Sequence, residues 1–214
     1  MSKDDVQPTI FLVDDDPSVR KALGRGLTAE GFIVRAWDNA LAFLEDHDPA
    51  APGCLVADVA MPGLSGLELQ SRLSASGYAR PMVFITGKGS IPMTVQAMRA
   101  GAVSFLPKPV HLAELVAVVR EAIDRDRSAR RARADRATVE SRLTALTARE
   151  REVLELVIAG KMNKQIAAAL GTAEKTIKVH RGRVMLKMQV RSVAELVALT
   201  SQAGIRGGEA NRSG

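Results

Sequence analysis

With 214 residues, 46% of them hydrophobic and 25% charged, the chain has room for one large or two small globular domains. Its single cysteine, Cys54, excludes an internal disulfide, and the apolar run around it favours a buried, inert thiol over a nucleophile. No apolar run approaches membrane-spanning length and residues 1–5 lack a signal peptide's apolar region, so we expect a soluble, cytoplasmic protein without a membrane partner.

The charge is distributed unevenly along the chain. Residues 1–122 contain 11 Lys or Arg and 14 Asp or Glu, a net charge of −3, whereas residues 123–214 contain 19 and 10, a net charge of +9. We therefore expect an acidic module joined to one that meets a polyanion. The simpler alternative is that the basic surface only aids solubility.

Short apolar runs alternate with helical patterns through the first 123 residues. After Asp16, an acid suited to capping a helix, Pro17 suits the first helical position. This alternation predicts an α/β fold with a five-stranded, parallel, doubly wound sheet. The predicted strands are 9–13, 32–36, 54–58, 82–85 and 103–106, and the predicted helices are 17–27, 39–46, 64–76, 91–100 and 111–123.

Polar residues stand at the carboxyl ends of four of these strands. Asp14 and Asp15 follow the first strand, and Asp58 ends the third. Thr86 follows the fourth strand and Lys108 follows the fifth. Because the carboxyl ends of parallel strands share one edge of the sheet, these side chains are expected to converge. Each alone has an ordinary explanation as a helix cap, a turn residue or a solvated lysine, but five of them at four strand ends favour a site.

Carboxylates gathered without a cation repel one another, and a hard divalent cation relieves this repulsion. Mg²⁺ prefers carboxylate oxygens together with water and phosphate, and it neutralises charge while a phosphoryl group is transferred. Asp58 is the expected nucleophile, which gives an aspartyl phosphate. Lys108 would contribute a positive charge, and Thr86 a hydroxyl donor, to the new phosphoryl oxygens.

Residues 9–123 resemble the receiver domain of two-component systems, a flavodoxin-like fold. The resemblance implies that a sensor histidine kinase phosphorylates Asp58. It also implies a Mg²⁺ site made by Asp14, Asp15, Asp58 and the carbonyl of Ala60, with Asp14 acting partly through water. The matching motifs are Val13-Asp14-Asp15, the segment 58–66, Ile85-Thr86-Gly87 and Lys108-Pro109.

The same resemblance assigns Thr86 and Phe105 to a switch pair, in which the hydroxyl moves toward the phosphoryl group and the aromatic ring turns inward. It further implies a cis peptide bond between Lys108 and Pro109. One position departs from the family pattern, because Lys88 stands where close relatives often carry histidine. A cation there can change the lifetime of the phosphoryl group, in a direction that the sequence does not give.

An arginine-rich connector occupies residues 125–143. It lacks Gly and Pro, and its good helix formers predict an extension of the preceding helix. A solvated charged face is the favoured interpretation of this run, and contact with DNA phosphates is the alternative. Its arginines are Arg125, Arg127, Arg130, Arg131, Arg133 and Arg136.

Capping boxes and glycines divide the rest of the chain into four predicted helices, a separate all-α domain. Thr172 is the expected cap of the third helix. The middle two helices are separated by a tight turn at Gly171, which predicts a helix-turn-helix. The predicted helices begin at Thr147, Lys164, Ala173 and Ser192 and end near Gly160, Leu170, Met188 and Gln202.

The third of these helices has two different faces. Lys178 and Val179 lie on a face suited to a major groove, where Lys contacts guanine edges or phosphates and apolar groups contact thymine methyls. A merely solvated basic face is the alternative. The stripe expected in the core is Ile177, Val184 and Met188.

Residues 144–203 resemble the DNA-binding domain of the NarL/FixJ (LuxR-type) regulators, and with the receiver they indicate the FixJ/StyR-like subgroup. The resemblance implies that Lys178 and Val179 face bases and that Lys164, Thr176 and Arg181 approach phosphates. Gly182 stands where relatives often have a base-contacting lysine. Val193, Leu196 and Val197 would form a dimer surface on DNA, with an ordinary core as the alternative. The matching motifs are 146–150, 160–164, Ile166-Ala167, Leu170-Gly171, 176–181 and 185–188.

Together the two resemblances imply a DNA-binding response regulator. Phosphorylation of Asp58 would alter the face made by the fourth helix and fifth strand and favour a homodimer. The dimer would bind two half-sites in double-stranded promoter DNA, with RNA polymerase as a further partner. An Asp-nucleophile, Mg²⁺-dependent phosphatase and a constitutive DNA binder are the alternatives. No insertion is long enough for a phosphatase cap, so we expect no enzyme.

The expected organisation has four parts. These are a receiver domain at 1–124, a connector at 125–143, a helix-turn-helix domain at 144–203 and a disordered tail at 204–214.

Overall fold

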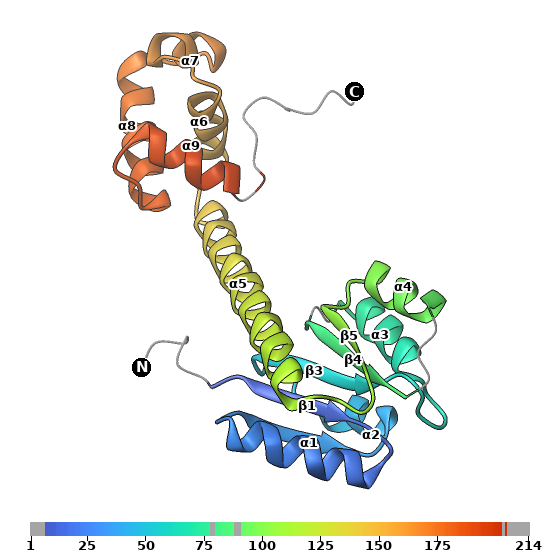
Figure 1. Ribbon diagram of the computed structural model, residues 1–214. Helices are drawn as coiled ribbons and strands as arrows, with labels where there is room; N and C mark the ends of the chain where they lie inside the picture. Colours follow the sequence, from blue (N-terminus) through green and yellow to red (C-terminus); the bar gives the residue numbers. More distant parts are fainter. Residues whose placement is uncertain (1–6, 78–79, 88–90, 203, 205–214) are drawn as a thin grey trace. The chain divides into compact units, whose positions relative to one another are not determined.

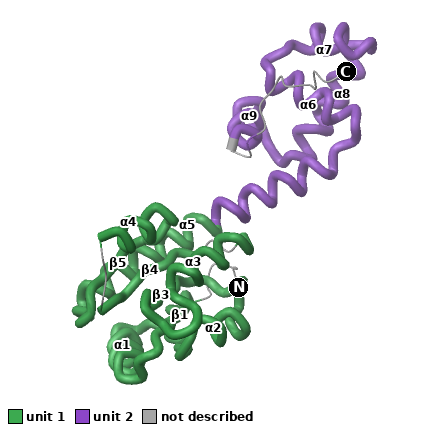
Figure 2. Tube along the Cα trace, turned by 90° about the vertical axis from the view of Figure 1, so that its right-hand side faces the viewer, with its two compact units in different colours: residues 1–130 green, residues 131–214 purple. Residues whose placement is uncertain are grey.

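The computed structural model describes residues 7–77, 80–87, 91–202 and 204. The chain divides into two compact units, residues 1–130 and 131–214 (Figure 2). Lys88 and nearly all of the predicted tail lie outside the described residues. No helix in the described part of the chain is both long enough and apolar enough to cross a membrane.

The first unit is a five-stranded parallel sheet with helices on both faces (Figure 1). The strand order β2-β1-β3-β4-β5 confirms the predicted doubly wound fold. The strands are β1 (Thr9–Val13), β2 (Ile33–Trp37), β3 (Gly53–Asp58), β4 (Met82–Thr86) and β5 (Ser104–Pro107). The helices are α1 (Pro17–Ala29), α2 (Ala40–Asp46), α3 (Gly66–Ala75), α4 (Ile91–Arg99) and α5 (Leu112–Thr144).

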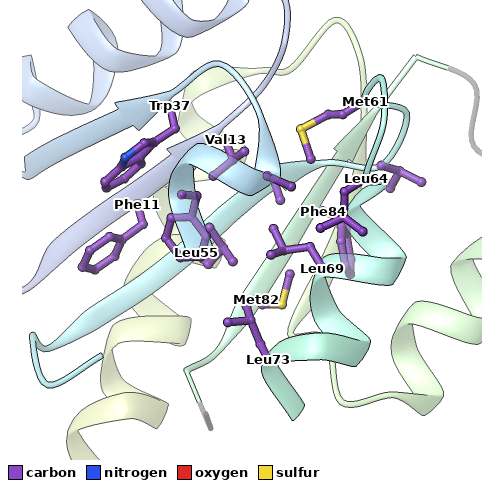
Figure 3. Close-up of a cluster of buried hydrophobic side chains, with 14 of the residues drawn as sticks. Phe11, Val13, Trp37, Leu55, Met61, Leu64, Leu69, Leu73, Met82 and Phe84 are labelled. Atoms are coloured by element: carbon purple, nitrogen blue, oxygen red, sulfur yellow. The ribbon is translucent and has the colours of Figure 1, made fainter. Parts of the chain in front are cut away.

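Each face of the sheet has its own hydrophobic cluster. Side chains from α2, α3 and α4 cover one face, where Phe11, Leu55 and Phe84 of the strands belong to the same cluster as Leu69 and Leu73 of α3 (Figure 3). Side chains of α1 and α5 cover the other face. β3 is buried at every residue, as expected for a central strand of a parallel sheet. The strand that carries Asp58 is therefore held from both sides.

Several predicted strand and helix ends are wrong by one or two residues, and those of β2 and α3 have clear physical causes. β2 begins at Ile33, not Phe32, and it ends on the buried Trp37. α3 begins at Gly66 because Ser65 is its cap: Ser65 and Glu68 form a reciprocal capping box, which the sequence pattern could have revealed. Asp16 caps α1 as predicted and accepts from two backbone N–H groups.

The second unit contains the predicted four helices, α6 (Ala148–Ile158), α7 (Asn163–Ala169), α8 (Glu174–Met188) and α9 (Val193–Gln202). Ile177, Val184 and Met188 of α8 are fully buried, as predicted. Val139 and Leu143, from the last turns of α5, belong to the same core. This core thus includes residues that precede 144, the position where the sequence suggested a domain boundary.

One cap in the second unit was predicted wrongly. The residue that caps α8 is Ala173, not Thr172, and it forms no side-chain hydrogen bond. The Thr172 backbone N–H instead donates to the carbonyl of Ala167, in the turn that follows α7. α9 does begin after a serine cap, since the Glu195 N–H donates to Ser192 Oγ at 3.1 Å.

Candidate functional site

Three carboxylates meet at the carboxyl edge of the sheet. In the described part of the chain, ligand oxygens of Asp14, Asp15 and Asp58 all lie within 4.8 Å of one another. Asp14 and Asp58 are buried and Asp15 is exposed. β1 and β3 are neighbours in the parallel sheet, so the residues at their ends converge as the sequence predicted.

Lys108 joins two of these acids. Its Nζ lies 2.7 Å from Asp14 Oδ2 and 2.6 Å from Asp58 Oδ2. The second oxygen of each acid accepts a backbone N–H, from Asp16 at 2.9 Å and from Ala60 at 3.1 Å. One ammonium group therefore neutralises part of two buried negative charges.

The pKa values follow from burial and from this bridge. Burial raises the pKa of Asp14, and the hydrogen bond from Lys108 offsets only part of that effect. Burial alone would lower the pKa of Lys108, but its hydrogen bonds to Asp14 and Asp58 outweigh this and raise it. The two carboxylates therefore favour the protonated, positively charged form of Lys108.

The backbone around Asp58 is held by a close contact with α3. A Cβ added to Gly66 would lie 2.3 Å from the carbonyl oxygen of Asp58 and 3.1 Å from the Phe84 ring. The Gly66 N–H donates to the carbonyl of Val59 at 3.0 Å. Only glycine lets α3 begin this close to the end of β3, so Gly66 positions Asp58.

The other predicted residues of this edge lie on β4 and β5. Thr86 ends β4 and is buried, and its carbonyl accepts the Lys108 backbone N–H at 2.8 Å. Phe105 is half-buried, 6.3 Å from the Phe84 ring centre. The peptide bond between Lys108 and Pro109 is cis, as the resemblance implied. Cys54 is fully buried, and burial raises its pKa to about 12, which fits an inert thiol.

The predicted DNA-contacting residues are presented on α7 and α8. Lys164, Thr176, Lys178 and Val179 are exposed, and Val179 is 50% exposed despite its apolar side chain. Arg181 is half-buried, and its guanidinium donates to Asn163 Oδ1 at 2.8 Å. This hydrogen bond links α8 to the first residue of α7.

The three residues predicted for a dimer surface have different surroundings. Leu196 is fully buried in the hydrophobic cluster of the second unit, which is the ordinary-core alternative. Val193 is half-buried and Val197 is 39% exposed. Of these three residues, only Val193 and Val197 remain candidates for a dimer surface.

The arginines of the connector are largely paired along α5. Four of them form ion pairs with acids three or four residues away, at 2.6–3.2 Å. Arg142 donates to the carbonyl of Met188, at the carboxyl end of α8, and so lies away from the amino-terminal half that holds Lys178. These contacts favour the solvated-face interpretation over contact with DNA.

Two buried ionic networks were missed by the sequence analysis. Glu150 forms a capping box with Thr147 and also accepts a hydrogen bond from Lys187 at 2.6 Å. Asp126 accepts the Gly53 N–H at 2.8 Å and pairs with Arg130 at 2.7 Å. Both networks join residues far apart in sequence, so no local pattern could have revealed them.

Two family models match the chain. One, described as the response regulator receiver domain, covers residues 10–120. The other, described as bacterial regulatory proteins of the luxR family, covers residues 144–200. The two matches fall on the acid-bearing sheet and on the helices that surround α8.

Known proteins match nearly the whole chain. Nodulation protein W of Bradyrhizobium diazoefficiens is 45% identical over 92% of this chain and 86% of its own length. Transcriptional regulatory protein FixJ of the same organism is 41% identical over 92% of this chain and 96% of its own. The solved structure of response regulator StyR has 48% identity and a TM-score of 0.85, covering 92% of this chain and 99% of that one.

Proposed function

The chain belongs to the two-component response regulators that join a receiver to a LuxR-type DNA-binding domain, in the FixJ- and StyR-like group, and we propose that Asp58 is its phosphoacceptor. Members of this family bind DNA and regulate transcription, and they are not a class of metabolic enzymes. The observation that supports Asp58 is the bridge from Lys108 to Asp58 and Asp14. Of the three clustered acids, Asp58 is the one that ends the central strand.

The proposed reaction is phosphoryl transfer from a sensor histidine kinase. A carboxylate oxygen of Asp58 attacks the phosphorus of a phosphohistidine, the P–N bond breaks, and the imidazole leaves with the electron pair and is protonated. Lys108 already contacts an oxygen of Asp58, so its charge is in place as the phosphoryl oxygens arrive. The Thr86 hydroxyl is the second proposed contact for these oxygens.

The acid cluster fits a Mg²⁺ ion, which receivers typically bind at such a pocket. Asp14, Asp15 and Asp58 offer hard oxygen ligands close together, and the carbonyl of the exposed Ala60 is the fourth proposed ligand. When bound, Mg²⁺ supplies charge neutralisation during transfer. Two of these acids, Asp14 and Asp58, also contact Lys108.

We propose that phosphorylation leads to a homodimer through α4. Movement of Thr86 toward the phosphoryl group, with Phe105 turning inward, would change the face made by α4 and β5. α4 exposes an apolar stripe at helical spacing: Ile91 is 84% exposed, Val95 43% and Met98 45%. A second copy of the chain is the proposed occupant of this stripe, because burying it removes apolar area from water.

The proposed output is promoter binding by the dimer in the cytoplasm. Two copies of α8 would bind two half-sites, with Lys178 and Val179 facing bases, while Lys164, Thr176 and Arg181 approach phosphates. Val193 and Val197 on α9 are proposed to meet across the dimer on DNA. RNA polymerase is the further partner that a regulator at a promoter would contact.

The proposal is tested by treating the full chain with a small acyl phosphate and Mg²⁺. We expect one phosphoryl group per chain by intact mass, and a monomer-to-dimer shift by sedimentation. Asp58→Asn should abolish both changes, whereas Asp16→Asn keeps a capping side chain and should leave both intact. Phosphorylation and dimerisation that persist in the Asp58→Asn protein would refute the assignment.

A further inference from the structure

The outward face of α8 is basic at its amino-terminal end and apolar beyond it. Lys175, Val179, Gly182 and Leu186 follow one another at spacings of three or four residues, so all four lie on one side of the helix. That side is opposite the buried stripe of Ile177, Val184 and Met188. Val179 is 50% exposed and Leu186 is 78% exposed.

An exposed leucine at the centre of a helix face contributes nothing to the core. Leu186 is more exposed than Val197 or Leu41, which are 39% and 49% exposed. Gly182, one turn before it, has no atom within 4 Å of the position that a Cβ would occupy. No contact within the described structure therefore requires a glycine, although glycine lowers helix stability. Both features leave this face of α8 open to a partner outside the chain.

The charges beside this stripe indicate which partner fits. Lys175, Lys178 and Arg183 are exposed, and within the described residues none of them has a hydrogen-bonded or ion-paired partner. The basic residues at the edges of this face therefore suit a polyanion. The centre of the face, at Val179, Gly182 and Leu186, offers methyl groups and no hydrogen-bond donor. In a major groove the apolar group that matches such a centre is the 5-methyl of thymine.

We propose that Val179 and Leu186 read thymine methyl groups and that Gly182 leaves the base pair between them without a hydrogen-bond donor. This inference rests on the proposed DNA-binding role of α8 and adds its sequence preference. Seven helical residues span roughly 10 Å, or about three base-pair steps. The preferred half-site thus carries two thymines about three base pairs apart, and no required guanine between them.

The first step of the test is selection from a pool of duplexes with a randomised core. The full chain is used with and without acyl phosphate, so that sequence preference is separated from control by Asp58. We expect the two thymines in every selected half-site, whichever form of the protein selects it. Failure of phosphorylation to change binding would overturn only the proposed control. A selected half-site without thymines, or no selection at all, would overturn the inference.

The second step removes single methyl groups by replacing each selected thymine with deoxyuridine. Each replacement should weaken wild-type binding about fourfold, the equivalent of about 0.8 kcal/mol for one buried methyl group. Leu186→Ala should lose sensitivity to one replacement and Val179→Ala to the other. Leu41→Ala removes the same atoms from an exposed leucine of α2 and should respond like the wild type.

Two results distinguish base reading from a structural effect. If Leu186→Ala weakens binding equally to thymine and deoxyuridine duplexes, Leu186 does not contact the methyl and the inference is wrong. Gly182→Lys adds a donor and should shift the preference between the two thymines toward guanine in a repeated selection. An unchanged preference would show that Gly182 does not face the bases, which contradicts the proposal.

Discussion

At the scale of single residues, Lys108 is the cation that compensates the buried negative charge of the acid cluster. Its ammonium lies within 2.7 Å of both Asp14 and Asp58, two carboxylates that are almost entirely buried. Burying a carboxylate without a compensating charge lowers the stability of the folded state. Without the lysine, the two acids would also repel each other. A Mg²⁺ ion held by these acids would offset the same repulsion that Lys108 offsets.

We predict that Lys108→Met destabilises the first unit and that Mg²⁺ restores much of the loss. Removing the cation should lower the free energy of unfolding by about 3 kcal/mol. Added Mg²⁺ should raise the stability of the variant more than that of the wild type, because a bound ion stabilises the folded state. The sole tryptophan, Trp37, is buried in this unit and reports urea unfolding by fluorescence.

Lys21→Met is the matched control, since Lys21 is an exposed residue of α1. It should leave both the unfolding midpoint and its Mg²⁺ dependence unchanged. A Lys108→Met protein that is as stable as the wild type without Mg²⁺ would contradict the account.

The residues of this site were predictable, and their pairing was not. Strand periodicity placed Asp14, Asp58 and Lys108 at strand ends, and parallel topology brings such ends together. That one ammonium group bridges two carboxylates depends on side-chain geometry between residues that are 50 or more positions apart in the sequence, which no local pattern encodes. Leu196 shows the same limit, because helical spacing could not tell a core position from a dimer surface.

At the scale of elements, the start of α6 depends on a buried ionic network. Glu150 accepts from Lys187 at 2.6 Å and from the Thr147 N–H at 2.9 Å. These hydrogen bonds lower the pKa of Glu150 from 4.5 to about 2, and the bond from Lys187 has the largest effect. The network ties the first turn of α6 to the last turn of α8.

We predict that the stabilisation provided by the Glu150 network is lost on acidification. The folded pKa is lower than the unfolded value, so the stabilisation is fully present above pH 4.5 and disappears as the pH falls to about 2. Glu150→Gln should be less stable than the wild type at pH 7, and the difference should close near pH 2. Hydrogen exchange of α6, corrected for intrinsic rates, measures this.

Glu152→Gln is the control for the acid prediction. Glu152 pairs with Arg149 on the surface, where such pairs contribute little. Its exchange should follow the wild type throughout. A constant difference between Glu150→Gln and the wild type from pH 7 to 2 would rule out the lowered pKa as the cause.

The part of α5 that leaves the first unit is held by a clamp of Asp126 and Arg130. Arg130 donates to the carbonyls of Ala50 and Ala51 at 2.8 and 2.6 Å and pairs with Asp126, which accepts the Gly53 N–H. Gly53 has a φ of +141°, and a Cβ there would collide with the carbonyl of Thr9. The loop before β3 is thus fixed to α5.

We predict that Arg130→Ala lowers the stability of the first unit by about 2 kcal/mol, because Asp126 stays buried without its cation. Exchange should also rise in the turns of α5 around residue 130. Arg131→Ala, which removes an exposed neighbour on the same helix, should change neither quantity. Equal effects of the two substitutions in Trp37-monitored unfolding would disprove the clamp.

Element order was the best-predicted level of the structure, and element ends were the least well predicted. All five strands and the helices between them follow from alternating apolar periods. The shifts at β2 and α3 arise because a buried tryptophan and a serine cap, Trp37 and Ser65, override the apolar run. The hydrogen bonds of Arg130 could not be predicted from local sequence patterns, because the carbonyl groups that accept them are about 80 residues away.

At the scale of the whole molecule, the uneven charge now corresponds to two functions. The segment with a net charge of −3 includes the acid cluster, and the segment with +9 includes the helices that match the LuxR-type family. Phosphorylation need not change the affinity of one α8 for DNA. In the proposed mechanism, joining two copies would make the second half-site contact intramolecular, and this would raise the overall affinity.

The most direct test of the central claim is operator binding at fixed salt, measured by footprinting on a selected duplex. With acyl phosphate and Mg²⁺, we predict that the apparent Kd of the wild-type chain falls by about tenfold or more. The Asp58→Asn protein should bind weakly under both conditions. An equal gain in affinity by Asp58→Asn, or no gain by the wild type, would contradict the claim that Asp58 controls DNA binding.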